Sequence, residues 1–196
     1  MIITISGTPG SGKSTIAKIL VEQLKAQRIY VGGLRRGLAK VKGMTLAELN
    51  EYAKTHPETD VEVDKTAAAQ ARRLAQEGKT VIVEGRTQYH FLPESIKVYI
   101  KVDLDEGARR IWKDLQNKET NAERNEAKVS TFDDVKKEVI AREEADAFRF
   151  KKYYRLDHRD ESQYDLVIDT TKITAKEAAE QIMGFIEKRI AKLSKK

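Results

Sequence analysis

The chain has 196 residues and a mass of 22.3 kDa, which suits one α/β domain. It has no cysteine, no run apolar enough for a membrane span and no N-terminal signal pattern, so we expect a cytoplasmic protein with no membrane partner and no thiolate metal site. The net charge is +6, but five of these charges lie at a solvated C-terminal helix end, on Lys188, Arg189, Lys192, Lys195 and Lys196. We therefore expect no nucleic-acid partner.

The chain opens with a β-branched run, Met1–Ser6, which predicts a buried strand. An apolar helical face follows over Thr15–Ala26. Between the two, residues 7–14 read Gly-Thr-Pro-Gly-Ser-Gly-Lys-Ser and fit the phosphate-binding pattern G-x-x-x-x-G-K-[ST] without a mismatch. A chance glycine-rich turn would rarely combine the full spacing with this strand and this helix.

The pattern predicts an ATP site, because a glycine-rich loop and a helix N-terminus direct backbone N–H groups at phosphate oxygens. Lys13 would contact the β- and γ-phosphates, and the Ser14 hydroxyl would hold Mg²⁺. The acceptor remains open, since kinases, ATPases and GTPases share the pattern. The predicted ATP-binding residues are Gly7, Thr8, Pro9, Gly10, Ser11, Gly12, Lys13, Ser14 and Thr15.

Some fifty residues of short helices separate the second predicted strand from the third, more than one crossover needs. This excess predicts a small lobe over the phosphate loop. The second strand, Arg28–Val31, is expected to break at Gly32-Gly33. Helices are predicted over Leu34–Lys42 and over Asp60–Glu77. A further helix is predicted to begin at Thr45, which forms a capping box with Glu48.

The third strand, Thr80–Val83, ends in Glu84-Gly85-Arg86. Ligands of parallel sheets collect at the C-terminal ends of the strands, so these residues are candidates for function. The Glu84 carboxylate would hold Mg²⁺ or its waters, and the Arg86 guanidinium would hold a phosphate. The alternative is a turn with a surface ion pair.

The remaining elements alternate in the same way and complete a doubly wound, five-stranded parallel sheet of the P-loop type. Glu119–Val129 is highly charged and is expected to be a mobile loop. The predicted elements are strands over Ser95–Val102 and Leu166–Asp169, and helices over Asp105–Asn117, over Thr131–Arg155 and after Thr174.

Arg142 and Arg149 lie seven residues apart on the long predicted helix, so they share one face about 10 Å apart. Two such arginines can close over a polyphosphate. They can equally form ordinary helix-surface ion pairs, and the residues alone favour that interpretation. The acidic neighbours are Glu138, Glu143, Glu144 and Asp146.

Taken together, these segments resemble nucleoside monophosphate (NMP) kinases, and among them the compact cytidylate (CMP/dCMP) kinase-like proteins. The resemblance implies an α/β P-loop NTPase three-layer sandwich with a core of residues 1–31, 79–112 and 157–196. It further implies a helical NMP-binding lobe (32–78) and a lid (113–150). It covers nearly the whole chain and rests on Ile2–Thr15, Gly32–Ala39, Gly43–Leu46, Val83–Arg86, Arg142-Glu143, Arg149–Tyr154 and Tyr164–Thr170.

The resemblance also implies roles for single residues. Arg36, Asp64 and Arg86 fall on positions that bind the acceptor NMP. Arg142 and Arg149 fall on lid positions that act, with Lys13, on the transferring phosphoryl group. The sequence departs from the family's pattern at four positions, which puts the accepted base in doubt: Gly33 and Gly37 replace acidic residues, Gly107 replaces a frequent arginine, and Ala67 stands at the spacing of a usual glutamine.

The resemblance implies that the chain transfers the γ-phosphoryl group of ATP to an NMP, CMP or dCMP first of all, with Mg²⁺ as cofactor. We expect a monomer rather than an oligomer. An ionised phosphate acceptor needs no general base. Two alternatives stay open. One is another small-molecule P-loop kinase, adenylate kinase-like or with an alcohol acceptor, for which Glu84 is the candidate base. The other is a nucleotide-dependent RNA-binding NTPase that uses the basic tail.

Overall fold

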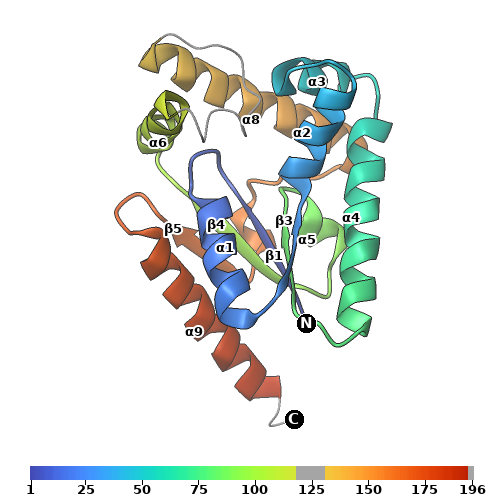
Figure 1. The fold of residues 1–196 in the computed structure, drawn as a ribbon, viewed down its shortest axis with the longest axis vertical. Helices are drawn as coiled ribbons and strands as arrows, with labels where there is room; N and C mark the ends of the chain where they lie inside the picture. The colour runs from blue at the N-terminus through green and yellow to red at the C-terminus, as the bar shows by residue number, and fades with distance from the viewer. Residues whose placement is uncertain (118–130, 194–196) are drawn as a thin grey trace.

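The computed structural model describes residues 1–117 and 131–193. Its strands form one parallel sheet in the order β2-β3-β1-β4-β5 (Figure 1). This confirms the predicted five-stranded parallel sheet and places the first strand at its centre. The strands are β1 (Ile2–Gly7), β2 (Gln27–Tyr30), β3 (Val81–Glu84), β4 (Ile96–Lys101) and β5 (Leu166–Asp169).

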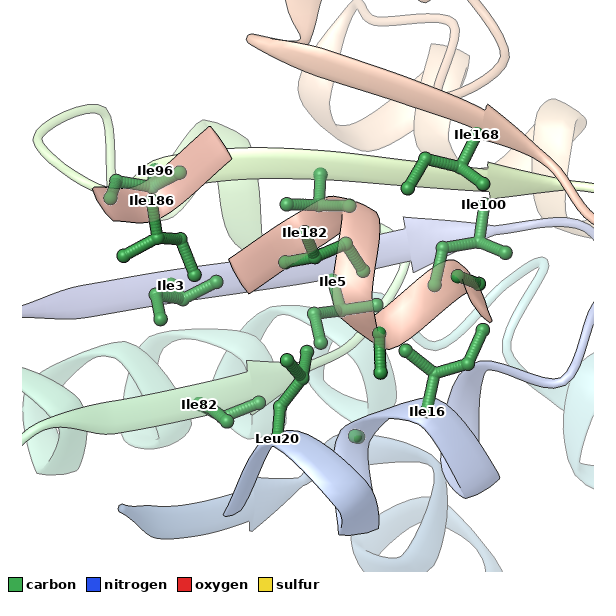
Figure 2. Packing of buried hydrophobic residues seen from close by; sticks show 14 of the residues in the cluster. Ile3, Ile5, Ile16, Leu20, Ile82, Ile96, Ile100, Ile168, Ile182 and Ile186 are labelled. Atoms are coloured by element: carbon green, nitrogen blue, oxygen red, sulfur yellow. The ribbon is translucent and has the colours of Figure 1, made fainter. Parts of the chain in front are cut away.

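Helices cover both faces of the sheet, as the predicted three-layer sandwich requires. On one face, isoleucines of the strands pack against α1 (Lys13–Leu24) and α9 (Ala175–Leu193). Figure 2 shows Ile16 and Leu20 of α1 and Ile182 of α9 directed at this part of the sheet. Fully burying such a side chain stabilises the fold by about 1.5–3 kcal/mol. The β-branched runs therefore build both the strands and most of this core.

On the other face, α4 (Glu58–Gln76) packs closely against β2 and β3. Ala67, Ala68 and Ala71 supply its buried side, and small side chains bring the helix near the strands. Ala67 is fully buried in this cluster, which explains why no glutamine stands there: the position faces the sheet. The short helix α5 (Gln88–Phe91) follows β3 and was not predicted.

Helices also gather beyond the C-terminal ends of the strands, at the top of Figure 1, away from both chain termini. They are α2 (Val31–Val41), α3 (Leu46–Tyr52), α6 (Leu104–Gln116) and α8 (Phe132–Tyr154). Ala108 and Ile111 of α6 pack against Val135 and Val139 of α8. A short 3₁₀ helix, Glu161–Gln163, precedes β5. The predicted loop over 119–129 lies outside the described residues.

The prediction that a helix begins only at Leu34 is wrong, although β2 does end at Tyr30, just ahead of Gly32 and Gly33. Both lie in the first turn of α2, which begins directly after β2. The physical reason is local packing: a Cβ at Gly33 would lie 2.7 Å from a ring carbon of Tyr30, so the helix starts with residues that have no side chain. The capping box of Thr45 and Glu48 is confirmed.

The division into a core, an NMP-binding lobe and a lid stays a prediction. The segment 32–78 contains most of α2 and all of α3 and α4, and the described part of the lid segment consists of the end of α6 and most of α8. Within residues 1–117 and 131–193, no helix combines the length and the apolar character needed to cross a membrane.

Candidate active site

The phosphate loop joins β1 to α1 and depends on glycine. Gly10 and Gly12 have φ angles of 72° and 83°, in the left-handed region that side chains disfavour. A Cβ on Gly10 would lie 2.3 Å from the carbonyl oxygen of Gly107, and a Cβ on Gly107 would lie 2.9 Å from that of Pro9. The backbone of α6 thus presses on the loop, which gives a physical reason for the glycine at position 107.

Lys13 is directed across the inside of the loop. Its Nζ donates hydrogen bonds to the Thr8 carbonyl oxygen (2.6 Å) and to Ser11 Oγ (3.4 Å). Burial, together with the nearby cations Arg86 and Arg142, lowers the pKa of Lys13 to about 7. An ammonium group in this position would gain strongly from an anionic ligand.

Ser14 and Glu84, the two predicted metal ligands, lie in direct contact. Ser14 Oγ donates a hydrogen bond to Glu84 Oε1, and Arg28 Nη2 donates one to Glu84 Oε2. The Glu84 side chain is almost fully buried. Hydroxyl and carboxylate oxygens are the donors that Mg²⁺ prefers, and it usually takes few of them from protein and the rest from phosphates and water. The pair therefore fits Mg²⁺ brought in with a nucleotide.

Arg86 and Arg149 share one carboxylate, that of Asp146. Arg86 Nη1 donates to Asp146 Oδ2, and Arg149 Nη2 donates to Asp146 Oδ1. Arg86 also lies 2.6 Å from Glu143 Oε1. Burial alone would raise the pKa of Asp146, but the two guanidinium groups outweigh it and hold that pKa well below its usual range. These residues form one buried ionic network.

The network continues from α8 into α4. Arg149 Nε donates to Asp60 Oδ2 (2.8 Å), and Arg35 Nη1 donates to Asp60 Oδ1. Arg149 is only 1% exposed. Asp146 is one of the four acidic neighbours offered as partners, but the pair does not lie on the helix surface, because α3 and α4 enclose it: Arg149 Nη1 is 3.4 Å from the Asn50 carbonyl oxygen.

Asp64 on α4 is a second buried carboxylate. Its oxygens accept hydrogen bonds from the Thr87 hydroxyl (2.8 Å), the Gln88 amide (2.9 Å) and the Tyr154 hydroxyl (2.8 Å). Burial raises the pKa of Asp64 to about 6, although these hydrogen bonds oppose the shift. The carboxylate connects α4, the residues after β3 and the end of α8.

One cavity of about 980 Å³ brings most of the predicted site residues together. The predicted ATP residues Gly7 and Thr8 do not line it; Thr8 instead accepts the Lys13 hydrogen bond with its carbonyl. The functional roles of the lining residues stay predictions. Besides Pro9 to Thr15 of the loop, those predicted are Arg36, Asp64, Glu84, Arg86, Arg142 and Arg149.

Sequence reasoning missed three members of the site: Arg28, Asp60 and Asp146. Arg28 had a usable signal, because it is a charged residue within a short strand of a buried sheet. Asp146 was considered only as one of several helix neighbours, although it lies between the two arginines of α8. Asp60 had no signal, since its partners Arg35 and Arg149 come from two other helices.

Comparisons with known proteins place the chain among kinases. A family model described as "AAA domain" matches residues 3–130. A cytidylate kinase of Archaeoglobus fulgidus is 36% identical, with both chains fully covered. Cytidylate kinases of Methanothrix thermoacetophila and Methanocaldococcus jannaschii are 40% and 39% identical, over 87% and 88% of this chain and 88% and 89% of theirs.

Solved structures share the fold at low sequence identity. An uncharacterized protein from Eubacterium ventriosum superposes with a TM-score of 0.66 at 19% identity, over 95% of this chain and 98% of its own. Shikimate kinase from Acinetobacter baumannii superposes with a TM-score of 0.55 at 16% identity, over 96% and 93%. These likenesses support the P-loop kinase fold. The substrate has to be inferred from the residues of the site.

Proposed function

The chain belongs to the cytidylate kinase family, and on that premise we propose that it transfers the γ-phosphoryl group of ATP to CMP or dCMP, giving ADP and the diphosphate. The observation that carries the proposal is the meeting of a complete phosphate loop with arginines from α2, from the turn after β3 and from α8 around one cavity. Such a cavity can hold two phosphate groups in line.

On the donor side, the loop amides and the N-terminus of α1 would bind the β- and γ-phosphates of ATP. Lys13 would exchange its bond to the Thr8 carbonyl for phosphate oxygens, which also favours its charged form. Ser14 and Glu84 would hold Mg²⁺, which supplies charge neutralisation when it is bound. The donor half of the site therefore needs little beyond positioned charge.

On the acceptor side, Arg36 and Arg86 would hold the NMP phosphate in line for attack on the γ-phosphorus. Arg86 is already desolvated and directed by Asp146 and Glu143, so it is held in place before the acceptor arrives. Arg142 lines the same cavity and would spread the charge on the transferring group. The acceptor phosphate is already ionised, and no residue has to remove a proton.

An alcohol acceptor would instead require a carboxylate within reach of its hydroxyl group. Glu84 was the candidate for that role. In the structure both of its oxygens already accept hydrogen bonds, from Ser14 and from Arg28. This engagement favours a phosphate acceptor over an alcohol.

The test is ADP release from Mg·ATP with CMP, dCMP, UMP, AMP, GMP and dTMP, against a control without acceptor. We expect CMP or dCMP to stimulate ADP release far above the control and above the purine nucleotides. The Lys13→Ala variant should keep its fold, checked by circular dichroism, and lose the stimulation. If no monophosphate exceeds the control, the proposed function is wrong.

A further inference from the structure

Tyr30 is the last residue of β2 and touches a residue of the acceptor side. Its hydroxyl oxygen accepts a hydrogen bond of 2.6 Å from Nη1 of Arg36, one helical turn into α2. The same Nη1 lies 3.2 Å from the Gly32 carbonyl oxygen. The Arg36 head is therefore fixed from two directions, by one side chain and one backbone carbonyl.

The Tyr30 ring is itself held in place. The guanidinium carbon of Arg28 lies 4.7 Å from the ring centroid, a cation–π distance. Arg28 is in turn paired with Glu84, which lies opposite Tyr30 in the register of β2 and β3. A continuous series of contacts thus runs from Ser14 through Glu84, Arg28 and Tyr30 to Arg36.

Two glycines make room for this ring. A Cβ at Gly32 would lie 2.9 Å from a Tyr30 ring carbon, and a Cβ at Gly33 would lie 2.7 Å from another. Gly37, on the same helix, has no atom within 4 Å of the place where its Cβ would stand. Glycine is unfavourable inside a helix compared with alanine. At Gly32 and Gly33 the Tyr30 ring gives a reason for it, because a side chain would not fit there, whereas at Gly37 a side chain would fit.

We propose that Tyr30 is a positioning residue for Arg36, and that Gly32 and Gly33 are there to seat its ring; this inference rests on the proposed function. Tyr30 holds the Arg36 guanidinium in the direction required by the acceptor phosphate. The replacement of an acidic residue by Gly33 is then part of the same arrangement as Tyr30. Removing only the Tyr30 hydroxyl keeps the ring on Arg28, so the donor side should not respond to that change.

Tyr30→Phe removes only the hydroxyl group and keeps the ring. We expect the KM for CMP to rise about three- to tenfold, the value of one hydrogen bond of ordinary strength, while the KM for ATP and the melting temperature stay unchanged. The matched control is Tyr52→Phe on α3, whose ring stacks on His56 outside the cavity and which should leave both KM values unchanged.

Gly33→Ala tests the seating of the ring through a double-mutant cycle. Alone, it should raise the KM for CMP by a similar factor, because the new methyl group displaces Tyr30. Added to Tyr30→Ala, it should change the KM by less than about twofold, since no ring remains to be displaced. Gly184→Ala in α9, where a Cβ meets no atom within 4 Å and which lies away from the cavity, is the control and should leave the KM for CMP unchanged.

The outcomes separate the two proposals. A wild-type protein without CMP-dependent ADP release overturns the proposed function itself. A wild-type protein that is active, with a Tyr30→Phe variant that keeps its KM for CMP, overturns the role of Tyr30 alone. A Gly33→Ala effect of equal size in both backgrounds overturns the seating of the ring.

Discussion

Asp146 accepts a hydrogen bond from Arg86, a residue sixty positions earlier in the chain, and both side chains are at least nine-tenths buried. The carboxylate comes from α8 and the guanidinium from the turn after β3. Their contact ties the helix to the sheet at the point where an acceptor phosphate is expected. The same carboxylate also binds Arg149, so its loss leaves two buried cations without their shared anion.

We therefore expect Asp146→Asn to lower the free energy of unfolding by about 3 kcal/mol, measured by urea denaturation at pH 7. The pKa of Asp146 is lowered in the fold, so its stabilisation is present above the ordinary aspartate pKa and is lost as the pH falls below it. The difference from wild type should shrink in acid. The control is Glu144→Gln, an exposed carboxylate of the same helix. Equal stabilities at pH 7 would contradict the bridging role.

Lys13 should take up a proton when Mg·ATP binds. Its pKa of about 7 in the free protein leaves most molecules uncharged at pH 8, whereas bound phosphates favour the ammonium form. We expect an uptake near one proton per ATP at pH 8, falling as the pH drops below 7. Calorimetry in two buffers of different ionisation enthalpy measures it. Lys13→Arg carries a permanent charge and should take up none; equal uptake in both proteins would exclude Lys13 as the source.

Asp64 should make the protein less stable as the pH rises from about 4 to about 6. Its pKa is raised by burial, so the unfolded chain releases the proton first and the stability present below pH 4 is lost through this window. The free energy of unfolding of Asp64→Asn, relative to that of the wild type, should rise by up to about 3 kcal/mol from pH 4 to pH 7. Glu62→Gln removes an exposed charge from the same helix as control. A constant difference across the window would show that Asp64 is ionised throughout.

Arg36→Gln should raise the KM for CMP about tenfold or more and lower kcat, because it removes a charged contact to the acceptor phosphate. The KM for ATP should stay near the wild-type value. Arg73→Gln, an exposed arginine of α4 away from the cavity, serves as control. A rise confined to the KM for ATP would move Arg36 to the donor side and refute its assignment.

The sequence alone predicted the sheet and the phosphate loop because both depend on local patterns. The β-branched runs of β1 and β3 allow few other structures, and the spacing from Gly7 to Ser14 has one well-defined use. The pairing of Thr45 with Glu48 was predictable for the same reason: its two partners are three residues apart.

The ionic network could not be predicted, because its partners are distant in the chain. Asp60 meets Arg149 across 89 positions, and nothing local distinguishes it from its acidic neighbours on α4. At Gly32-Gly33 the end of the strand was predicted, but the start of the next helix was placed too late. Their local pattern indicates a break, and only the place of the Tyr30 ring in space explains why a helix begins there.

The contact between Gly10 and Gly107 joins main chain to main chain, with no side chain between them that could give way. Ile111, one helical turn further along α6, packs against α8. The pair α6–α8 thus rests on the phosphate loop at this backbone contact. A change of loop shape at Gly10 on nucleotide binding would therefore displace α6, and α8 with it. Any residue larger than glycine at position 107 would push α6 away from the phosphate loop, even without contact between the new side chain and a substrate.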